Sequence, residues 1–347
     1  MRRRTAYVGM VLLLISLLLS GCLYGPNEKT SRVIDPPPAD LQPKEQGMAG
    51  GTAKAVSAKK QGGVELYLLT DLGYVVPYTL SIPKEKGIAK EALSYLVKDG
   101  PEKGVLPKGF SGILPKGTQV KGVNIQDGTA TVDFSKEFLS YDPKMENQIL
   151  SAVTWTLTGF DSVKRVNIWV NGHPLETMPK GKTPAQGLTR AQGINVEMAE
   201  GVNVSQSMPV TLYFLGQTPD NMVYYVPVTR MINRTNNVAQ ATLAELVKGP
   251  QNGSRLSSAL AETTQVHAAT VKGDTVMADF SKELLQYSDQ KSASKDAIQT
   301  IVLSLTENTG AKKVKITVDG KAGGTIETGQ SLEKPVMRPE IVNPGKF

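Results

Sequence analysis

Hydrophobic and polar positions along the chain follow a series of patterns that predicts alternating strands and helices. Two apolar, β-prone runs on either side of a short turn predict a hairpin, and apolar residues at helical spacing then predict a helix that ends at Gly-Pro. An alternating pattern around an Asp-Gly turn predicts a second hairpin, which a second helix and a last strand follow. In order, these segments are 64–69, 74–80, 88–97, 123–126, 130–132, 149–157 and 166–170.

The same series returns about 146 residues later. Residues 132–141 match 278–287 at seven of ten positions, and collinear matches on both sides indicate a tandem duplication. Each copy has the order β-β-α-β-β-α-β, which is typical of a small α+β sandwich whose helices cover one face of a sheet. The sequence therefore predicts an α+β fold with two tandem modules, at 64–179 and 210–326.

A fainter repeat follows each module. The segment 190–195 begins with arginine and ends with asparagine, and so does 338–343. We therefore expect an arm after each module, one within the linker at 180–209 and one in the C-terminal segment at 327–347. Arms that dock back on the folded body would couple the two modules.

The N-terminus has the pattern of an export signal. Three arginines precede an apolar run over 8–19, which is shorter than the roughly 20 residues of a membrane-spanning helix. The run ends in Leu-Ser-Gly-Cys, which resembles the lipobox of bacterial lipoproteins. That resemblance implies that the signal peptide, 1–21, is removed and that Cys22 carries a diacylglyceryl thioether with acyl chains such as palmitate. The alternative is an uncleaved anchor with an incidental cysteine.

Residues 22–63 change in composition to proline, lysine, glutamate, alanine and glycine. Such a segment buries too little apolar surface to offset the entropy of ordering it. We therefore expect a flexible, lipidated tether with an end-to-end distance of roughly 35–40 Å. It would hold the modules outside the cytoplasm, anchored by lipid to the cell membrane.

The composition limits the kinds of binding site that the chain can form. The 347 residues are 40% hydrophobic and 20% charged, as in an ordinary globular protein. The net charge of +7 falls to +4 without the three N-terminal arginines, an excess too small to predict a nucleic-acid-binding surface. One cysteine and two histidines exclude an internal disulfide and a Cys/His zinc cage. We expect no cofactor, no metal site and no nucleic-acid partner.

Two repeated carboxylate pairs are the main catalytic candidates. Asp133 and Asp279 are each followed four residues later by a glutamate, Glu137 and Glu283, as an acid–base pair of a glycosidase would require. The Asp-Phe-Ser stretch at a strand end also predicts a helix-capping turn, in which Asp or Ser accepts backbone N–H bonds. We favour the cap, because two copies of one turn are commoner than two complete active sites.

Other candidate groups lack a repeated counterpart. His173 and His267 each correspond to a lysine in the other module, so neither belongs to a chemistry that the modules share. The Gly-Lys-Thr stretch at 181–183 imitates the end of a nucleotide-binding loop, but Glu176 stands where that loop needs its first glycine. We interpret this match as chance, and we predict that the protein is not an enzyme.

Aromatic residues and strand edges are candidate binding features. Six aromatic side chains are candidates for a sugar-stacking platform, although most are expected in cores. They are Tyr67, Trp155, Trp169, Tyr213, Tyr224 and Tyr225. Pro77 and Pro227 interrupt the second strand of each first hairpin, so these strands are expected to lie at a sheet edge or to carry a bulge. Proline usually blocks pairing at an edge, so our hypothesis is that these edges add a partner's strand or pair module with module. The first strand of each hairpin is an alternative edge.

The whole chain resembles the GerMN-domain family of sporulation and spore germination lipoproteins, with two such domains. The most specific stretches are the two DFSKE segments at Asp133 and Asp279, together with 151–158, 225–229 and 335–339. The resemblance implies a role in spore formation and germination at the membranes around the developing spore. It also implies a fold similar to the ring-building domains of the mother cell to forespore channel complex. No catalytic residue of the family carries over to this sequence.

These observations predict a non-catalytic, membrane-anchored assembly protein whose modules bind envelope or channel-complex proteins. The alternative is an envelope protein that binds or modifies spore peptidoglycan. A third hypothesis, a sensor of small solutes, requires a closed pocket of which the sequence shows no sign.

Overall fold

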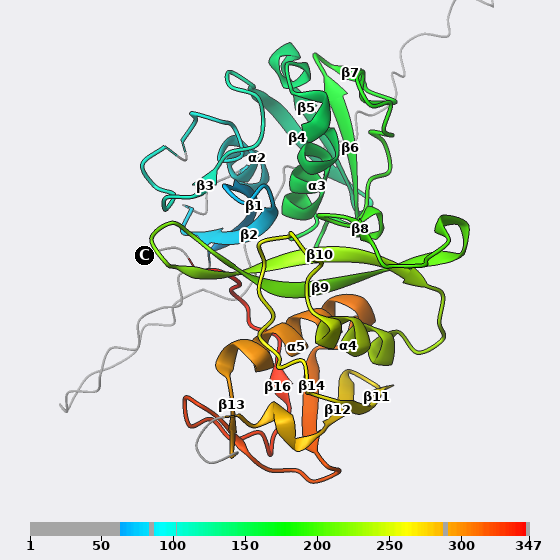
Figure 1. Cartoon of the computed structure of the whole chain (residues 1–347). Coiled ribbons are helices and arrows are strands. Elements are labelled where there is room, and N and C mark those ends of the chain that lie inside the picture. Colours follow the sequence, from blue (N-terminus) through cyan, green and yellow to red (C-terminus); the bar gives the residue numbers. More distant parts are fainter. Residues whose placement is uncertain (1–62, 83–86, 102, 287–290, 345–347) are drawn as a thin grey trace, which may run out of the picture. The chain divides into compact units, whose positions relative to one another are not determined.

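A computed structural model of the chain describes residues 63–82, 87–101, 103–286 and 291–344. Cys22, the predicted signal peptide and nearly all of the predicted tether lie outside these residues. The described chain has the predicted α+β fold, and two hairpins and one parallel strand pair of module 1 recur in module 2 (Figure 1).

Module 1 begins with a hairpin and continues through two helices into a second sheet. Its sheets have the strand orders β2-β1-β3 and β4-β5-β6-β7. The elements are β1 (Val64–Thr70), β2 (Val75–Leu80), α2 (Ile88–Ser94), β3 (Phe110–Ser111), β4 (Val120–Gln126), β5 (Thr129–Phe134), the 3-10 helices η1 (Lys136–Leu139) and η2 (Pro143–Met145), α3 (Glu146–Leu157), β6 (Arg165–Val170) and β7 (His173–Pro174).

Module 2 repeats this order, and its first hairpin is longer. Its sheets are β8-β10-β9, β11-β12-β14-β16 and the pair β13-β15. The elements from the first arm onward are η3 (Arg190–Gln192), β8 (Glu197–Met198), η4 (Val204–Gln206), β9 (Ser207–Gln217), β10 (Val223–Asn233), α4 (Val238–Lys248), β11 (Val266–Lys272), β12 (Thr275–Phe280), η5 (Lys282–Leu284), β13 (Ser292–Ala293), α5 (Lys295–Thr309), β14 (Lys313–Val318), β15 (Thr325–Ile326) and β16 (Val336–Met337).

The helices of each module lie between two sheets. In module 1, α3 contacts β1 and β6, while α2 contacts β1 and β4. In module 2, α5 contacts β9 and β14, while α4 contacts β9 and β11 (Figure 1). The expectation that the helices cover one face of a single sheet is therefore wrong. Helix α3 is buried at nine of its twelve positions, so its apolar surface needs cover on more than one side.

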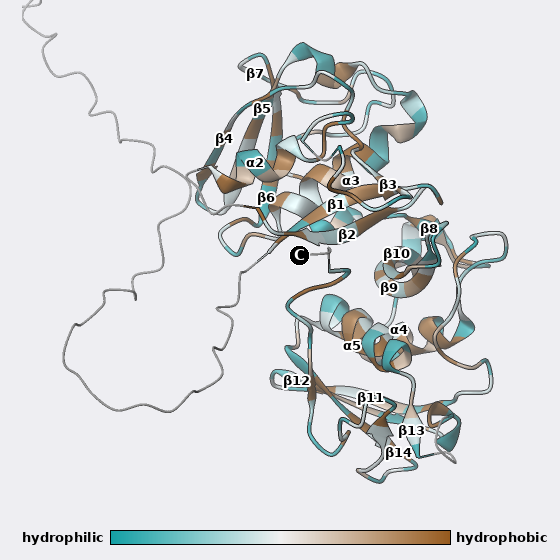
Figure 2. Ribbon diagram, turned by 90° about the vertical axis from the view of Figure 1, so that its left-hand side faces the viewer, coloured by the Kyte–Doolittle hydropathy of each residue, from teal (hydrophilic) through white to brown (hydrophobic). Residues whose placement is uncertain are grey.

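The burial pattern along each strand agrees with its place in these layers. Strand β5 alternates buried and half-buried residues, because only one of its faces meets the helices. All six residues of β2 are buried, and hydrophobic residues dominate β1 and β2 in Figure 2. A strand buried on both faces needs a second cover, which the arms and module 2 supply.

Helix α2 ends earlier than the predicted segment 88–97. Its last helical residue is Ser94, because the carbonyl oxygen of Leu96 accepts the N–H groups of both Ile113 and Leu114 at 2.8 Å. Leu96 and Val97 remain buried, but in a turn. The corresponding helix α4 runs to Lys248 and ends at a glycine, as predicted.

The alternative edges, the first strands of the hairpins, are covered by helix side chains. The N–H of Tyr67 on β1 donates to the hydroxyl of Thr156 at 3.0 Å, and the N–H of Tyr213 on β9 donates to the hydroxyl of Ser304 at 3.0 Å. Asn308 adds two bonds to the backbone of Thr211. The second helix of each module therefore satisfies backbone groups that a neighbouring strand would otherwise bind.

Candidate functional site

Two asparagines, one in each arm, join the modules through equivalent hydrogen bonds. Asn195 accepts the N–H of Val75 at 2.9 Å and donates to the carbonyl oxygen of Val75 at 2.7 Å. The same amide donates to the carbonyl oxygen of Pro227, in module 2, at 2.7 Å. The φ of Asn195 is 48°, a left-handed conformation that asparagine tolerates better than most residues.

Asn343 makes the same set of bonds with the roles of the modules exchanged. It accepts the N–H of Tyr225 at 2.8 Å and donates to the carbonyl oxygen of Tyr225 at 2.8 Å. It also donates to the carbonyl oxygen of Pro77, in module 1, at 2.9 Å. Its φ is 53°. Each asparagine therefore binds two strands. In its own module it binds the residue two positions before the strand proline, and in the other module it binds the carbonyl oxygen of the proline itself.

The strand prolines suit this arrangement. Pro77 and Pro227 have no N–H, so neither leaves a buried donor without an acceptor where the modules meet. Two residues further on, the N–H of Thr79 donates to the carbonyl oxygen of Asn343 at 3.1 Å. The N–H of Thr229 donates to the carbonyl oxygen of Ile194 at 2.8 Å. The strand edges predicted from the prolines are thus occupied by the arms of this chain.

A buried carboxylate joins the arginines that begin the two arms. Arg190 Nη1 lies 2.9 Å from Glu307 Oε1, and Arg338 Nη2 lies 2.7 Å from Glu307 Oε2. The side chain of Glu307 is 12% exposed, and those of the arginines are 28% exposed. Burial would raise the pKa of Glu307, but the two guanidinium groups outweigh burial and lower it. We call Asn195, Asn343, Arg190, Arg338 and Glu307 the inter-module clamp.

Each arginine of the clamp also binds the second helix of its own module. Arg190 donates to the carbonyl oxygen of Trp155 at 3.4 Å and to the hydroxyl of Thr158 at 3.0 Å. Arg338 donates to the carbonyl oxygen of Leu303 at 3.1 Å and to the hydroxyl of Thr306 at 2.8 Å. A cation at a helix C-terminus offsets the negative end of the helix dipole. This applies to Arg190, which binds the last turn of α3, whereas Arg338 binds α5 before that helix ends at Thr309.

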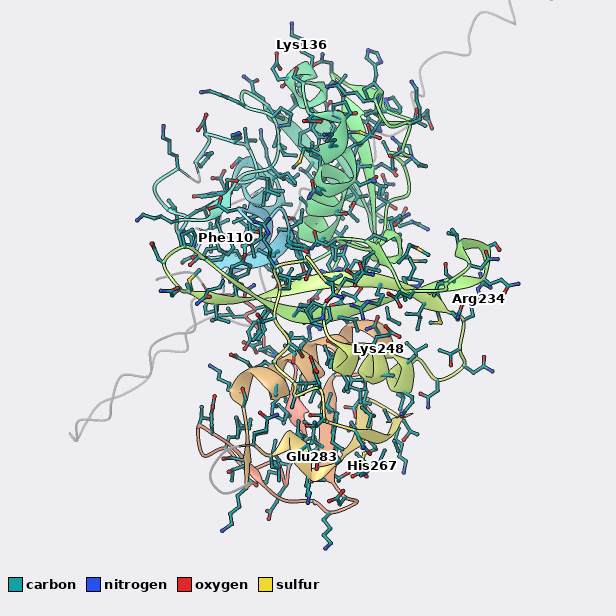
Figure 3. The ribbon with its side chains drawn as sticks, viewed as in Figure 1. Phe110, Lys136, Arg234, Lys248, His267 and Glu283 are labelled. Carbon is teal, nitrogen blue, oxygen red and sulfur yellow. The ribbon has the colours of Figure 1, made fainter. Side chains whose placement is uncertain are left out.

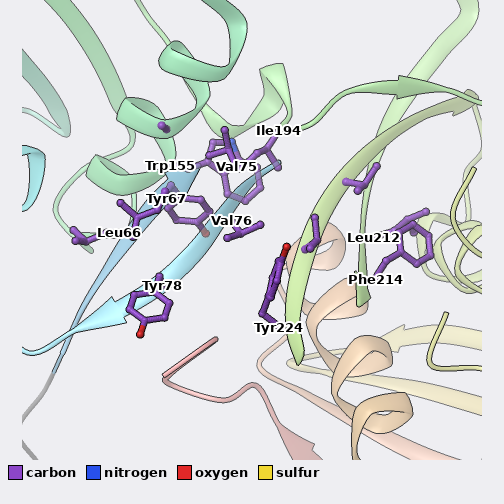
Figure 4. Close-up of a cluster of buried hydrophobic side chains, with 14 of the residues drawn as sticks. Leu66, Tyr67, Val75, Val76, Tyr78, Trp155, Ile194, Leu212, Phe214 and Tyr224 are labelled. Carbon is purple, nitrogen blue, oxygen red and sulfur yellow. The ribbon is translucent and has the colours of Figure 1, made fainter. Parts of the chain in front are cut away.

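Aromatic rings line the clamp. The guanidinium of Arg190 lies 4.4 Å from the ring centroid of Trp155 and 5.9 Å from that of Tyr67, and Arg338 lies 5.8 Å from the Tyr213 ring. Figure 4 shows Trp155 close to Ile194, the arm residue beside Asn195. Burial raises the pKa of Tyr67 well above 10, and the nearby carboxylate of Glu65 raises it further. These phenols therefore act as neutral packing groups.

A second contact between the modules is aromatic. The ring of Phe110 in module 1 lies 5.0 Å from the ring of Tyr78 and 5.1 Å from that of Tyr224 in module 2. The turns beside this cluster are tied by Tyr74, whose hydroxyl donates to the carbonyl oxygen of Ser254 at 3.0 Å. Edge contacts between rings add to area burial, so the modules meet through apolar as well as polar groups.

The comparison with known families agrees with this duplicated architecture. A model of the Germane family, described as "Sporulation and spore germination", matches residues 65–176 and 211–324, which is more than half of the chain. The chain belongs to the Germane family. Its role therefore lies in sporulation and spore germination, as the resemblance implied.

Relatives support the assignment over the full length. The chain is 38% identical to spore germination protein GerM of Bacillus subtilis (strain 168) over 366 aligned positions, with all of both chains covered. The solved tandem GerMN domains of GerM from Bacillus subtilis are 40% identical, with a TM-score of 0.76, over 81% of this chain and 99% of that one. The tandem arrangement is thus shared with a solved relative.

The repeated aspartates of the two Germane modules hold a turn. Asp133 accepts the N–H of Gly172 at 2.9 Å, and Asp279 accepts that of Gly320 at 2.9 Å. Neither aspartate caps the following 3-10 helix, so the predicted helix cap is wrong for them. The serine of the motif does not cap it either, because Ser135 and Ser281 accept the N–H groups of the residues just before β4 and β11. In both copies the aspartate still lies on the strand, so its side chain reaches the turn after the neighbouring strand.

The histidines have separate surroundings. His267 lies on β11, with Nδ1 3.1 Å from Asp279 Oδ2 and 3.9 Å from Asp319 Oδ1 (Figure 3). Lys121, its counterpart in module 1, donates to Asn171 at 2.6 Å. His173 is exposed on β7. Among the residues that the structure describes, no group of three or more His, Cys, Asp or Glu could hold a metal ion.

The Gly-Lys-Thr stretch holds a carboxylate of this chain. The N–H of Gly181 donates to Glu146 Oε2 at 2.7 Å, and that of Thr183 donates to Oε1 at 3.2 Å. The hydroxyl of Tyr141 donates to Oε2 at 2.6 Å. Burial would raise the pKa of Glu146, but the bonds from Thr183, Tyr141 and Gly181 outweigh it and lower the pKa from 4.5 to about 2. Two amides of the loop-like stretch are therefore already occupied by an internal anion.

The six candidate aromatics do not form a common platform. Four of them, Tyr67, Trp155, Tyr213 and Tyr224, are at most 3% exposed and belong to the core. Trp169 on β6 and Tyr225 on β10 are half-buried and lie in different modules. The hydroxyl of Tyr225 donates to Asp296 at 2.7 Å.

Sequence reasoning missed Glu307 and Glu146. Glu307 corresponds to Gly159 in module 1, so comparing the two copies does not single it out as a repeated residue. The detectable signal was the arginine and asparagine five residues apart in both arms. No helix in the described part of the chain is long and apolar enough to cross a membrane. The predicted lipidation of Cys22 lies outside that part and stays a prediction.

Proposed function

We propose that the chain is a non-catalytic, lipid-anchored scaffold. In this proposal it assembles other proteins at an envelope or mother cell to forespore channel complex during sporulation, and its effect on germination follows from that assembly. The observation that carries the proposal is the inter-module clamp. A clamp that holds two equivalent modules together suits a protein whose task is to present two surfaces at a constant spacing.

The use of the repeated carboxylates supports a role without catalysis. Asp133 and Asp279 bind backbone turns in the same way in both modules. A catalytic carboxylate needs an oxygen directed at a substrate and a pKa suited to proton transfer. Hydrogen bonds from Thr317, Gly320 and His267 lower the pKa of Asp279 against the opposing effect of burial, as expected for a group that stays ionised to hold its turn.

The proposed location rests on the N-terminal sequence. The apolar run and the lipobox-like Leu-Ser-Gly-Cys ending favour export and lipidation at Cys22. Two acyl chains anchor a protein far more firmly than one, because each buried CH₂ contributes about 0.8 kcal/mol. The composition of residues 22–63 favours a tether long enough to keep the modules clear of the lipid headgroups.

Crosslinking and pull-down from sporulating cells tests the proposal. The native chain is compared with Cys22→Ala, with the double variant Asn195→Ala/Asn343→Ala, and with a surface control, Lys136→Ala. We expect the native chain and the control to recover the same envelope or channel proteins, and both other variants to lose them. Equal recovery by a folded clamp variant would refute the role of the clamp. Recovery of glycan strands or wall hydrolases instead would favour the peptidoglycan alternative.

A further inference from the structure

The two modules meet through one kind of surface that is used twice. Each module offers a proline carbonyl, and a threonine two residues later whose N–H and hydroxyl both bind the other module's arm. The hydroxyl of Thr79 donates to the carbonyl oxygen of Val342 at 3.2 Å, and the hydroxyl of Thr229 accepts the N–H of Ile194 at 2.9 Å. Each arm offers its asparagine in return. A surface that binds its own equivalent in this reciprocal way is the kind that joins identical subunits in two-fold dimers.

We infer that a second copy of this chain is a partner that this surface fits. In the resulting dimer the copies exchange modules, so that module 1 of each copy binds module 2 of the other. The clamp bonds that join the two modules of one chain, those of Asn195 with Pro227, Asn343 with Pro77 and Arg190 with Glu307, then form between two chains. This inference concerns self-assembly and does not depend on the scaffold function proposed above.

The connection between the modules allows the exchange. After β8 the chain runs through residues 199–206 before β9 begins, and in 200–206 only Val202 is not exposed. Backbone bonds tie only the ends of this linker to the hairpin, from Ala199 to Met231 at 3.0 Å and from Arg234 to Gln206 at 3.1 Å. Ala199 packs against the hydrophobic core, so the change of direction falls in 200–206, where few contacts are broken.

The contacts between the modules also favour a closed interface over separated modules. Parted modules would leave Glu307 with one arginine instead of two, and would expose Phe110 and Tyr224, which touch across the interface. Closing on a second copy restores both contacts. Anchoring many copies on one membrane would raise their local concentration and favour exchange, since linked binding depends on effective concentration.

Shortening the linker gives a direct test. Strands β8 and β9 lie on opposite sides of β10, so the chain must cross two strand spacings of about 4.8 Å. The strand ends are also offset by two residues, because Met198 pairs with Met231 and Ser207 with Asn233. The direct path is therefore about 12 Å. Deleting 200–205 leaves three Cα–Cα steps, which reach about 11 Å at most.

The deletion variant of residues 23–347 is expected to have twice the molar mass of the monomer by light scattering. Inserting six Gly/Ser residues at the same place, as the matched control, should leave a monomer. A folded, monomeric deletion variant would overturn the inference. A second experiment decides the question if the deletion variant does not fold.

That experiment uses two full-linker copies of residues 23–347, which contain no native cysteine. One carries Lys108→Cys and the other Asp220→Cys, at an inter-module ion pair of 3.6 Å. The copies are unfolded, refolded together at high concentration and treated with a short bismaleimide. We expect a crosslinked dimer containing both copies, and none from the control pair Lys136→Cys and Lys282→Cys, which lie outside the interface contacts. Absence of the mixed dimer from the first pair refutes module exchange.

Discussion

Glu146 is the carboxylate whose removal should have the most clearly defined effect on stability. Its side chain is 2% exposed and accepts N–H bonds from Gly181 and Thr183 and the hydroxyl of Tyr141. The substitution Glu146→Gln keeps the size and one acceptor oxygen but removes the negative charge. It therefore imitates the protonated carboxyl group.

The expected cost follows from the pKa. Folding lowers the pKa of Glu146 from 4.5 to about 2, and each pH unit corresponds to about 1.4 kcal/mol. The ionised group therefore contributes about 3 kcal/mol to the free energy of unfolding at neutral pH. A carboxyl whose pKa is lowered by folding contributes fully above its unfolded pKa, near 4.5. The contribution is lost as the pH falls towards 2.

Urea unfolding at several pH values between 7 and 2.5 measures this contribution. We expect Glu146→Gln to lose about 3 kcal/mol at pH 7 and to approach the wild-type stability at the lowest pH. The control is Glu176→Gln, an exposed glutamate of the same module, which should follow the wild type throughout. A loss below about 1 kcal/mol at pH 7, or a pH dependence equal to that of the wild type, would refute the assigned role of Glu146.

Three further predictions concern the clamp and the same loop. Glu307→Gln should cost about 2–4 kcal/mol in urea unfolding, because it leaves two half-buried arginines without their carboxylate. A loss below about 1 kcal/mol would contradict this. Asn195→Ala and Asn343→Ala should each lower the free energy of unfolding by about 2 kcal/mol, and the two losses should be nearly equal, since each substitution removes three equivalent bonds. Markedly unequal losses would show that the arms are not equivalent. Gly181→Ala should cost about 1–3 kcal/mol, because the added Cβ would overlap Glu146 Oε1. The double variant with Glu146→Gln should lose less stability than the two single losses added together, and full additivity would show that the two sites are independent.

Much of the fold was predictable because its signals are local. Alternation along β5 and helical spacing along α3 and α5 follow from the periods of strands and helices, which a single segment displays. The duplication allowed each prediction to be checked in the second copy. The errors arose where a locally predicted element binds a part of the chain further along, as when the carbonyl oxygen of Leu96 accepts the N–H groups of Ile113 and Leu114 and α2 ends early.

The candidate site was predictable only in outline. The repeated arginine and asparagine of the arms indicated docking, and the prolines indicated strand edges. Neither pattern showed that the arms and the edges bind each other. The DFSKE motif was interpreted as a helix cap, but in both copies its aspartate binds the turn after the neighbouring parallel strand, about 40 residues away, and not the adjacent helix.

The sequence by itself determined the family, the two α+β modules, their order of strands and helices, and an arm after each. Only the tertiary structure decided that the helices lie between two sheets, that the arms exchange contacts between modules, and that Glu307 binds both arginines. The physical reason is distance along the chain. Hydrophobic periodicity is a property of neighbouring residues, whereas Arg190 and Glu307 are 117 positions apart and meet only after both modules have packed.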